Sequence, residues 1–142
     1  MITIESPVRE RMSEDALSSF PNECCGFVFG VETDEEDRII TDMLTVTNSK
    51  DGDKRRRFEI KPADYLKAEQ FATDKNLLLI GVYHSHPNHP AIPSEHDRKS
   101  AQPWFSYIIL SVKEQHIAGI RSWRLNEEEQ FEEEIIINYQ IS

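Results

Sequence analysis

Two histidines and one aspartate are spaced as the ligands of a catalytic metal ion would be. His84 and His86 stand two positions apart at the end of an apolar run, so on a strand their side chains point to the same face. Asp97 follows eleven residues after His86, one turn into a predicted helix. Two imidazoles and a carboxylate leave one position of a tetrahedral zinc ion open, which is typical of catalytic rather than structural sites. We therefore expect these residues to bind one zinc ion per chain, which acidifies water and polarises a carbonyl group.

Each of these residues also has a purely structural explanation. A single histidine is often no more than a polar surface side chain, and Ser94 with Asp97 gives the Ser-x-x-Asp pattern of a helix capping box. The combination favours the metal site, because histidines end an apolar strand where turn residues are usual. The loop predicted at 85–93 contains three prolines, which lower the entropy lost in holding ligands in place.

Other metal-binding families with closely spaced histidines fit less well. A metallo-β-lactamase-like site needs an aspartate and a histidine soon after its second histidine, but Pro87 and Asn88 follow His86. A cupin needs a glutamate shortly after its second histidine, where this chain has Pro90 and Ala91. A zinc deaminase needs H-x-E and P-C-x-x-C, and neither pattern occurs.

The elements that must position these residues follow from hydrophobic periodicity and from turn residues. We expect strands at 1–4, 24–31, 39–47, 55–60, 77–84, 105–112, 117–125 and 131–139, and helices at 6–20, 62–75 and 94–102. The strand at 77–84 has no polar alternation until its end, which indicates burial on both faces. The sequence predicts an α+β fold of one domain over 1–142, with a mainly antiparallel sheet, two main helices and a short helix at the metal site.

Composition excludes several classes of partner. Against 26 acidic residues there are 16 Lys and Arg, giving a net charge of −10, which repels phosphate backbones and anionic membrane surfaces. We therefore expect no nucleic-acid and no membrane partner. The longest apolar run, at 77–83, is too short to span a bilayer, and the first residues lack the pattern of an export signal. Cys24 and Cys25 are adjacent, closer than a disulfide usually spans, so reduced thiols and a cytoplasmic location are expected.

Two short segments together resemble the JAMM (MPN+) metalloprotease signature, H-[ST]-H-P followed by S-x-x-D. The first is H-S-H-P at 84–87 and the second is S-E-H-D at 94–97. That family also carries a glutamate upstream, shortly before Cys-Gly, and Glu23 stands in this context in P-N-E-C-C-G. The resemblance extends from the first predicted helix to the last strand. The chain looks most like the short bacterial members, without the insertions that eukaryotic deubiquitinating relatives use to grip ubiquitin chains.

The resemblance implies an MPN/JAB-like fold with a mixed sheet, and roles for two further residues. Glu23 would act as the general acid and base, taking a proton from water and giving it to the leaving amine. The Ser94 hydroxyl would donate to the tetrahedral oxyanion. Glu95 shares a helix with a ligand and is expected to face solvent.

Three other features receive structural interpretations. Cys25 lacks a partner pattern for a nucleophile and is expected to be a buried thiol of a core strand. His89 and His96 are not expected to be ligands. The basic run at 54–57 is usually a solvated strand end, although it suits an acidic face on a protein substrate.

The resemblance further implies an isopeptidase or peptidase that cuts after the C-terminal glycine of a ubiquitin-like protein of the sulfur-carrier type. Two alternatives differ in class. A non-enzymatic MPN scaffold would have lost ligands, whereas this sequence keeps all of them. A hydrolase of the same fold with a small-molecule substrate is compatible with the same residues. The oligomeric state is not predicted.

Overall fold

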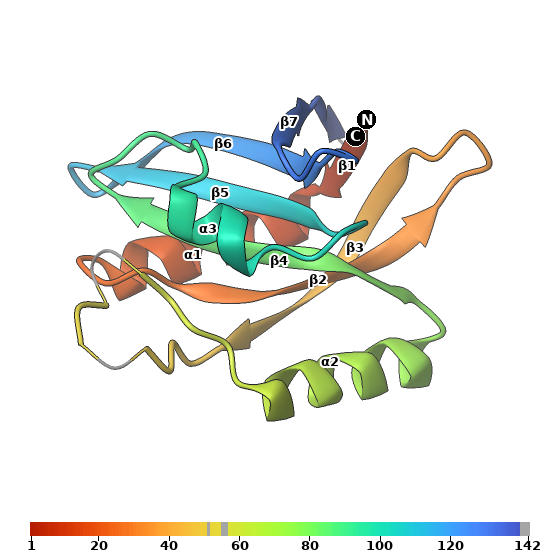
Figure 1. The fold of residues 1–142 in the computed structure, drawn as a ribbon, viewed down its shortest axis with the longest axis horizontal. Coiled ribbons are helices and arrows are strands. Elements are labelled where there is room, and N and C mark those ends of the chain that lie inside the picture. Colours follow the sequence, from red (N-terminus) through yellow and green to blue (C-terminus); the bar gives the residue numbers. More distant parts are fainter. Residues whose placement is uncertain (51, 55–56, 140–142) are drawn as a thin grey trace.

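The strands and helices of the computed structural model form one continuous sheet with a long helix on either side of it (Figure 1). The structure describes residues 1–50, 52–54 and 57–139. In these residues the elements are β1 (Ile2–Glu5), α1 (Ser6–Ser19), β2 (Cys25–Glu32), β3 (Arg38–Val46), α2 (Pro62–Lys75), β4 (Leu78–Pro87), α3 (Glu95–Ser100), β5 (Ser106–Lys113), β6 (His116–Leu125), β7 (Phe131–Glu134) and β8 (Ile136–Tyr139).

The sheet is mixed, and its two edges lie close to each other. The strand order is β7-β6-β5-β4-β2-β3-β1-β8. Strand β4 pairs antiparallel with β2 and parallel with β5, so it lies in the interior of the sheet. Strands β7 and β8 lie at opposite edges, although only Ile135 separates them in the chain. The Ile2 N–H donates to the Ile135 carbonyl at 2.9 Å. The sheet is therefore curled, and the segment from β7 to β8 passes from one edge to the other.

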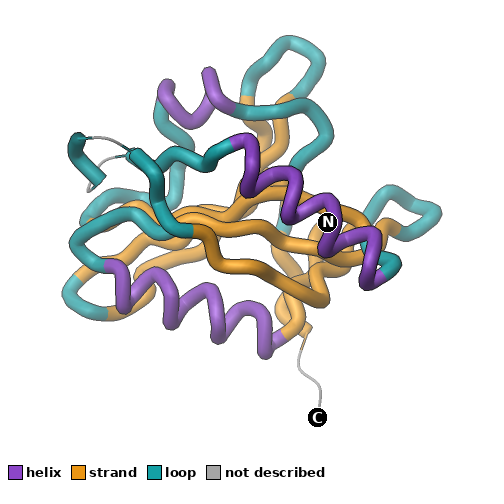
Figure 2. Tube along the Cα trace, turned by 90° about the horizontal axis from the view of Figure 1, so that it is seen from below, coloured by secondary structure: helices purple, strands orange, loops and turns teal. Residues whose placement is uncertain are grey.

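Each face of the sheet packs against one of the long helices. Helix α1 buries Val8, Met12 and Ala16, which follow each other at helical spacing, in a core with residues of β1, β3, β4 and β5. Helix α2 buries Ala68 and Ala72 on the other face, against aromatic residues of β2 and the end of β7. Figure 2 shows the two helices on opposite sides of the strands. The site strand β4 is thus buried on both faces, as its sequence predicts.

The expected α+β fold with a mixed sheet is confirmed, with three differences in the strands. The prediction of a strand at 55–60 is wrong for residues 57–60, which do not pair with any strand of the sheet. There the Glu59 N–H donates to Asn48 Oδ1 at 3.1 Å instead. Residues 55 and 56 lie outside the described ones. The single strand predicted at 131–139 is two strands, because Ile135 turns the chain from one edge partner to another.

The third difference lies at the site itself. Strand β4 continues to Pro87, beyond the predicted end at His84, because its ladder with β5 runs without interruption from Gly81 to Pro87. The predicted loop at 85–93 therefore begins later. Both histidines lie within a regular strand, which fixes their backbones more firmly than a loop would.

Candidate metal centre

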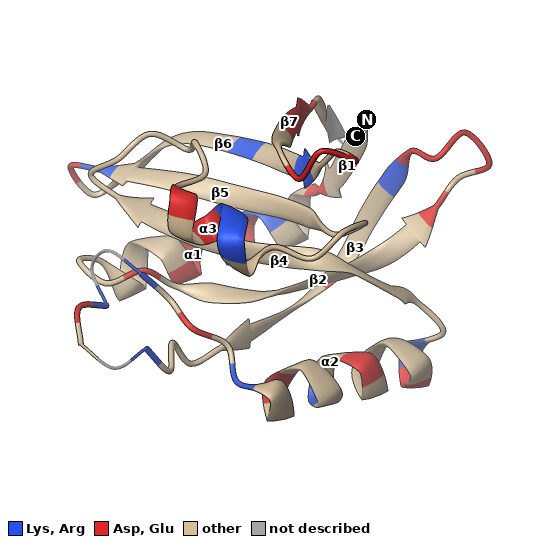
Figure 3. Ribbon diagram, viewed as in Figure 1, with Lys and Arg blue, Asp and Glu red and all other residues tan. Residues whose placement is uncertain are grey.

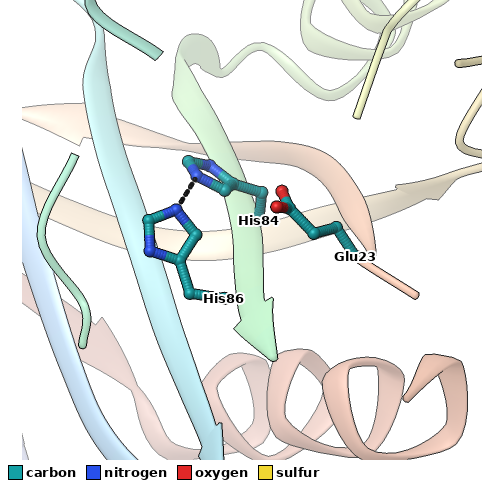
Figure 4. A group of neighbouring side chains, drawn as sticks. All are labelled: Glu23, His84 and His86. Carbon is teal, nitrogen blue, oxygen red and sulfur yellow. Dashed lines mark hydrogen bonds between the residues drawn. The ribbon is translucent and has the colours of Figure 1, made fainter. Parts of the chain in front are cut away.

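Strand β4 brings His84 and His86 to one face of the sheet, where their rings converge. Their Nε2 atoms lie 3.2 Å apart, and both residues are buried. Strand geometry places residues two apart on the same side, and the neighbouring strands β2 and β5 fix the backbone on both sides. Figure 4 shows both rings, with the carboxylate of Glu23 turned toward them.

Asp97 reaches the same point from helix α3. Its Oδ2 lies 3.2 Å from His86 Nε2 and 3.4 Å from His84 Nε2. A tetrahedral zinc ion at about 2.0–2.1 Å from each ligand atom would separate those atoms by roughly 3.3–3.4 Å. The three measured separations of 3.2, 3.2 and 3.4 Å agree with this spacing. The residues predicted as ligands therefore come together with dimensions that suit a zinc ion.

Hydrogen bonds around the cluster orient electron pairs toward its centre. His86 Nδ1 lies 2.9 Å from the Pro90 carbonyl oxygen, which can only accept, so Nδ1 carries a proton and Nε2 is the nitrogen that a metal ion would bind. The Asp97 Oδ2 accepts the Ser94 N–H at 2.8 Å. His84 Nδ1 is buried and has no hydrogen-bond partner among the described residues, and its ring stacks on Phe58 with centroids 4.5 Å apart.

The charges of the cluster are consistent with cation binding. Burial lowers the pKa of His84, which keeps its imidazole neutral as a ligand must be. Burial alone would raise the pKa of Asp97, but the histidines and the Ser94 N–H together bring it well below its usual range. Burial alone would lower the pKa of His86, but its contacts with Asp97 and the Pro90 carbonyl raise it, so this imidazole would release a proton on binding a metal ion. A carboxylate with two imidazoles is a donor set that zinc commonly takes.

Glu23 lies beside the two histidines with its backbone held by a loop. Its carboxylate and the two imidazoles offer ligand atoms within 4.8 Å of one another. The Glu23 N–H donates to the Lys54 carbonyl at 2.7 Å, and its carbonyl accepts from Asn48 Nδ2 at 3.1 Å. Burial raises the pKa of Glu23 to about 8. A buried carboxyl group in this position is suited to take up and release a proton near neutral pH.

Asn48 is a residue of the site that the sequence did not reveal. Its Nδ2 donates to the carbonyls of Glu23 and Arg57 at 3.1 and 3.0 Å. Its Oδ1 accepts the N–H groups of Lys50 and Glu59 at 3.0 and 3.1 Å. One amide therefore ties the start of β2 to both ends of the loop 48–59. In the sequence Asn48 opens the turn N-S-K-D-G-D, where asparagine is an ordinary turn residue.

Helix α3 begins with the capping box that the sequence predicts. Ser94 Oγ accepts the Asp97 N–H at 3.0 Å, and the Asp97 carboxylate accepts the Ser94 N–H. Because the hydroxyl oxygen acts as an acceptor here, its proton stays available for a further donation. Glu95 is exposed as expected and pairs with Arg98.

The remaining residues singled out in the sequence lie outside the cluster. His89 is exposed and His96 is half-buried. Cys24 and Cys25 are free thiols. Cys25 is fully buried in β2, where burial raises its pKa to about 12, so it is a core thiol as expected. In the basic run at 54–57, residues 55 and 56 lie outside the described ones, and Arg57 is exposed beside the site.

Two cavities flank the cluster and differ in character. The aromatic cavity, about 290 Å³, is lined by Phe58, Tyr65, Val82 and Tyr107 together with His84 and Asp97. The other cavity, about 710 Å³, is lined by Glu23, Arg57, His86 and Ser94 together with Pro90 and Ile92; we call it the polar cavity after its ionisable side chains. Figure 3 shows basic positions along the segment between β3 and α2, which borders both cavities. No helix in the described part of the chain is long and apolar enough to cross a membrane.

Comparisons with known proteins agree on one group of relatives. A family model described as prokaryotic homologs of the JAB domain matches residues 5–126. A desampylase of Pyrococcus furiosus is 30% identical over 122 residues, covering 85% of this chain and 79% of that protein. A CysO-cysteine peptidase of Mycobacterium tuberculosis is 28% identical over 127 residues, covering 88% and 83%. The solution structure of a Desulfitobacterium hafniense protein superposes with a TM-score of 0.86 at 29% identity, covering 99% and 94%.

Proposed function

Because the chain belongs to the family of prokaryotic homologs of the JAB domain, we propose that it is a zinc-dependent peptidase that acts on ubiquitin-like proteins. It hydrolyses the bond after the C-terminal glycine of a ubiquitin-like sulfur-carrier protein and releases the group attached there. The names of the relatives, desampylase and CysO-cysteine peptidase, support a peptidase that removes material from a small carrier protein.

The observation that carries the proposal is the convergence of four side chains. His84 Nε2, His86 Nε2 and Asp97 Oδ2 lie 3.2–3.4 Å from one another, with the buried Glu23 carboxylate beside them. A zinc ion held by the first three would polarise the scissile carbonyl and lower the pKa of water. The presence of the whole set argues against a scaffold that has lost its metal.

Glu23 and Ser94 supply the proton transfers and the charge stabilisation. The Glu23 carboxylate takes one proton from the attacking water as the carbon–oxygen bond forms. The same carboxyl group then gives that proton to the leaving nitrogen as the carbon–nitrogen bond breaks. The Ser94 hydroxyl donates to the oxyanion of the tetrahedral intermediate, while its oxygen continues to cap α3.

The acyl side of the substrate fits the aromatic cavity. Residues 58–60 line this side without a ladder partner. The backbone of Glu59 is already bonded to Asn48 and Ser49. An extended tail would therefore pair with the backbone groups of Phe58 and Ile60, which point to the other side. Two glycines at the end of the tail let its backbone pass close to the cluster. A bulky residue in place of the last glycine would collide with the groups that surround the scissile carbonyl.

A mass-resolved digest of three substrates tests the proposal. A sulfur carrier ending in Gly-Gly with a short C-terminal extension should be cut after the second glycine. The same fusion with valine in place of that glycine, and a linked ubiquitin dimer, should be poor substrates. Efficient cleavage of the dimer, or indifference to valine, would show that the substrate is wrong although the chemistry stands. Failure of the zinc-loaded protein to cut any fusion would favour a small-molecule substrate.

A further inference from the structure

The position of Glu23 decides which cavity receives the leaving group. In the proposed reaction the leaving nitrogen must lie within hydrogen-bond reach of the Glu23 carboxyl group. Glu23 lines the polar cavity and not the aromatic one. It also lines a third cavity, which contains none of the residues predicted to bind zinc and so does not border the scissile bond. The released group therefore occupies the polar cavity, while the carrier's tail lies on the other side of the cluster.

Arg57 lies on the wall of this same cavity, and its backbone is tied to that of Glu23. Asn48 Nδ2 donates to the carbonyl oxygens of both residues, at 3.1 Å to Glu23 and 3.0 Å to Arg57. Because both oxygens contact one nitrogen atom, the two residues are close neighbours. Phe58 follows Arg57 and lines the aromatic cavity, as expected for successive side chains of an extended segment, which point to opposite sides.

The guanidinium of Arg57 has the chemistry to bind an anion in this cavity. Arg57 is exposed, and no ion pair or hydrogen bond of its guanidinium is found among the residues described. Two acidic side chains line the cavity. Glu23 serves the proton transfer, and Glu95 pairs with Arg98, so neither is assigned to Arg57. His89 and His96 line it as well and add no negative charge. A carboxylate entering the cavity would meet a planar, permanently charged donor fork that can bind it through two hydrogen bonds.

We propose that Arg57 binds the α-carboxylate of the released group, so that the preferred leaving group is a single amino acid joined to the carrier through its α-amino nitrogen. In such a leaving group the carboxylate carbon is two bonds from the scissile nitrogen. Isopeptide-linked lysine places no carboxylate there, because its ε-nitrogen is separated from its α-carbon by four methylene groups. This inference rests on the proposed function and adds a specificity-determining residue to it.

Two matched substrates test the role of Arg57. Each is the sulfur carrier ending in Gly-Gly and extended by one alanine, with a C-terminal carboxylate in one substrate and a carboxamide in the other. The zinc-loaded wild-type protein should cleave the carboxylate form about tenfold or more faster in kcat/KM, since a charge-assisted hydrogen bond is lost with the amide. Arg57→Gln should abolish the preference, so that the ratio of kcat/KM between the carboxylate and the amide forms falls to about one.

Lys54→Gln is the control variant, because it removes one positive charge from the same loop and its side chain does not line the polar cavity. It should keep the preference for the carboxylate. Equal wild-type rates on the two substrates, or a preference that survives Arg57→Gln, would overturn the role of Arg57 while the proposed function stands.

Affinity separates the two proposals further. In the Glu23→Gln background, which removes the proton carrier, the carboxylate substrate should bind about tenfold more tightly than the amide only when Arg57 is present. If the wild-type protein cleaves neither substrate, the proposed function fails, and the affinity difference still decides whether Arg57 binds a carboxylate.

Discussion

The side-chain amide of Asn48 donates to the backbone carbonyl of Glu23 at 3.1 Å and so holds the proposed proton carrier against the loop 48–59. Aspartate at position 48 would keep the oxygen that accepts from Lys50 and Glu59 but would lose the donor to Glu23. We expect Asn48→Asp to retain zinc and to lose on the order of tenfold to a hundredfold in kcat, because small displacements of a catalytic group are costly.

Steady-state kinetics on the carrier fusion check this prediction for Asn48, with Ser49→Ala as the control. Ser49 is adjacent, and its hydroxyl donates to the Thr47 carbonyl at 3.4 Å, not to Glu23. A kcat that is unchanged in Asn48→Asp would mean that the loop does not position Glu23.

Zinc binding should depend on three residues. Metal analysis of the purified protein should give about one zinc per chain. His84→Ala, His86→Ala and Asp97→Ala should each lose the zinc, because the two protein ligands that remain would not hold the ion. His89→Ala is the matched control, since His89 is exposed and outside the cluster. Full metal content in all three variants would refute the ligand assignment.

Glu23→Gln should keep zinc and lose turnover. Glutamine is nearly isosteric but cannot carry the proton, so we expect a loss on the order of a hundredfold or more. Glu95→Gln removes an exposed acid that also lines the polar cavity but is paired with Arg98, and it should keep activity within about threefold of the wild type. Glu23 lies close enough to both histidines to be a metal ligand itself. Retained zinc with lost turnover in Glu23→Gln would therefore show that Glu23 carries the proton and does not bind the metal.

Ser94→Ala should affect both rate and stability. Loss of one oxyanion donor costs about 10²–10³ in rate, and loss of the cap costs about 1 kcal/mol of unfolding free energy. Kinetics on the carrier fusion, combined with urea denaturation, measure the two effects separately. A variant that is less stable but fully active would leave Ser94 with the capping role alone.

Arg38 offers a stability test away from the site. This residue is fully buried, pairs with Glu32 Oε2 at 3.2 Å, donates to Ser106 Oγ at 2.8 Å and lies over Trp104 at 4.1 Å. Its Nη2 has no partner among the described residues. Because an apolar side chain of similar length fills the space without a desolvated charge, Arg38→Met should lose less unfolding free energy than Arg38→Ala. Urea denaturation measures the difference, and equal losses would contradict it.

The sequence predicted the parts of the site that local patterns encode. Residues two apart on an apolar strand had to share a face, so the convergence of His84 and His86 followed from strand periodicity. The capping box of α3 was visible because it lies within four consecutive residues. The resemblance to JAMM proteins supplied Glu23, whose distance of sixty-one positions from His84 leaves no local signal.

What the sequence did not predict depends on long-range contacts. Asn48 resembles any other turn asparagine until the fold brings Glu23 and Glu59 to its amide. The same contacts explain why 57–60 does not form a strand: the Glu59 N–H is already bonded to a side chain. The division of 131–139 at Ile135 reflects the curl of the whole sheet, which no window of local sequence reports.

The passage of the chain from β7 to β8 has a consequence for synthesis on the ribosome. Among the described strands β1 is translated first and β8 last, yet they are parallel neighbours in register from Ile2 to Glu5. The emerging chain can build its hairpins and begin to cover α1, but β1 stays without its outer neighbour until the final strand is translated. The curled sheet is therefore completed only after β8 has emerged, and the pairing of β1 with β8 is a contact of long sequence separation that forms late.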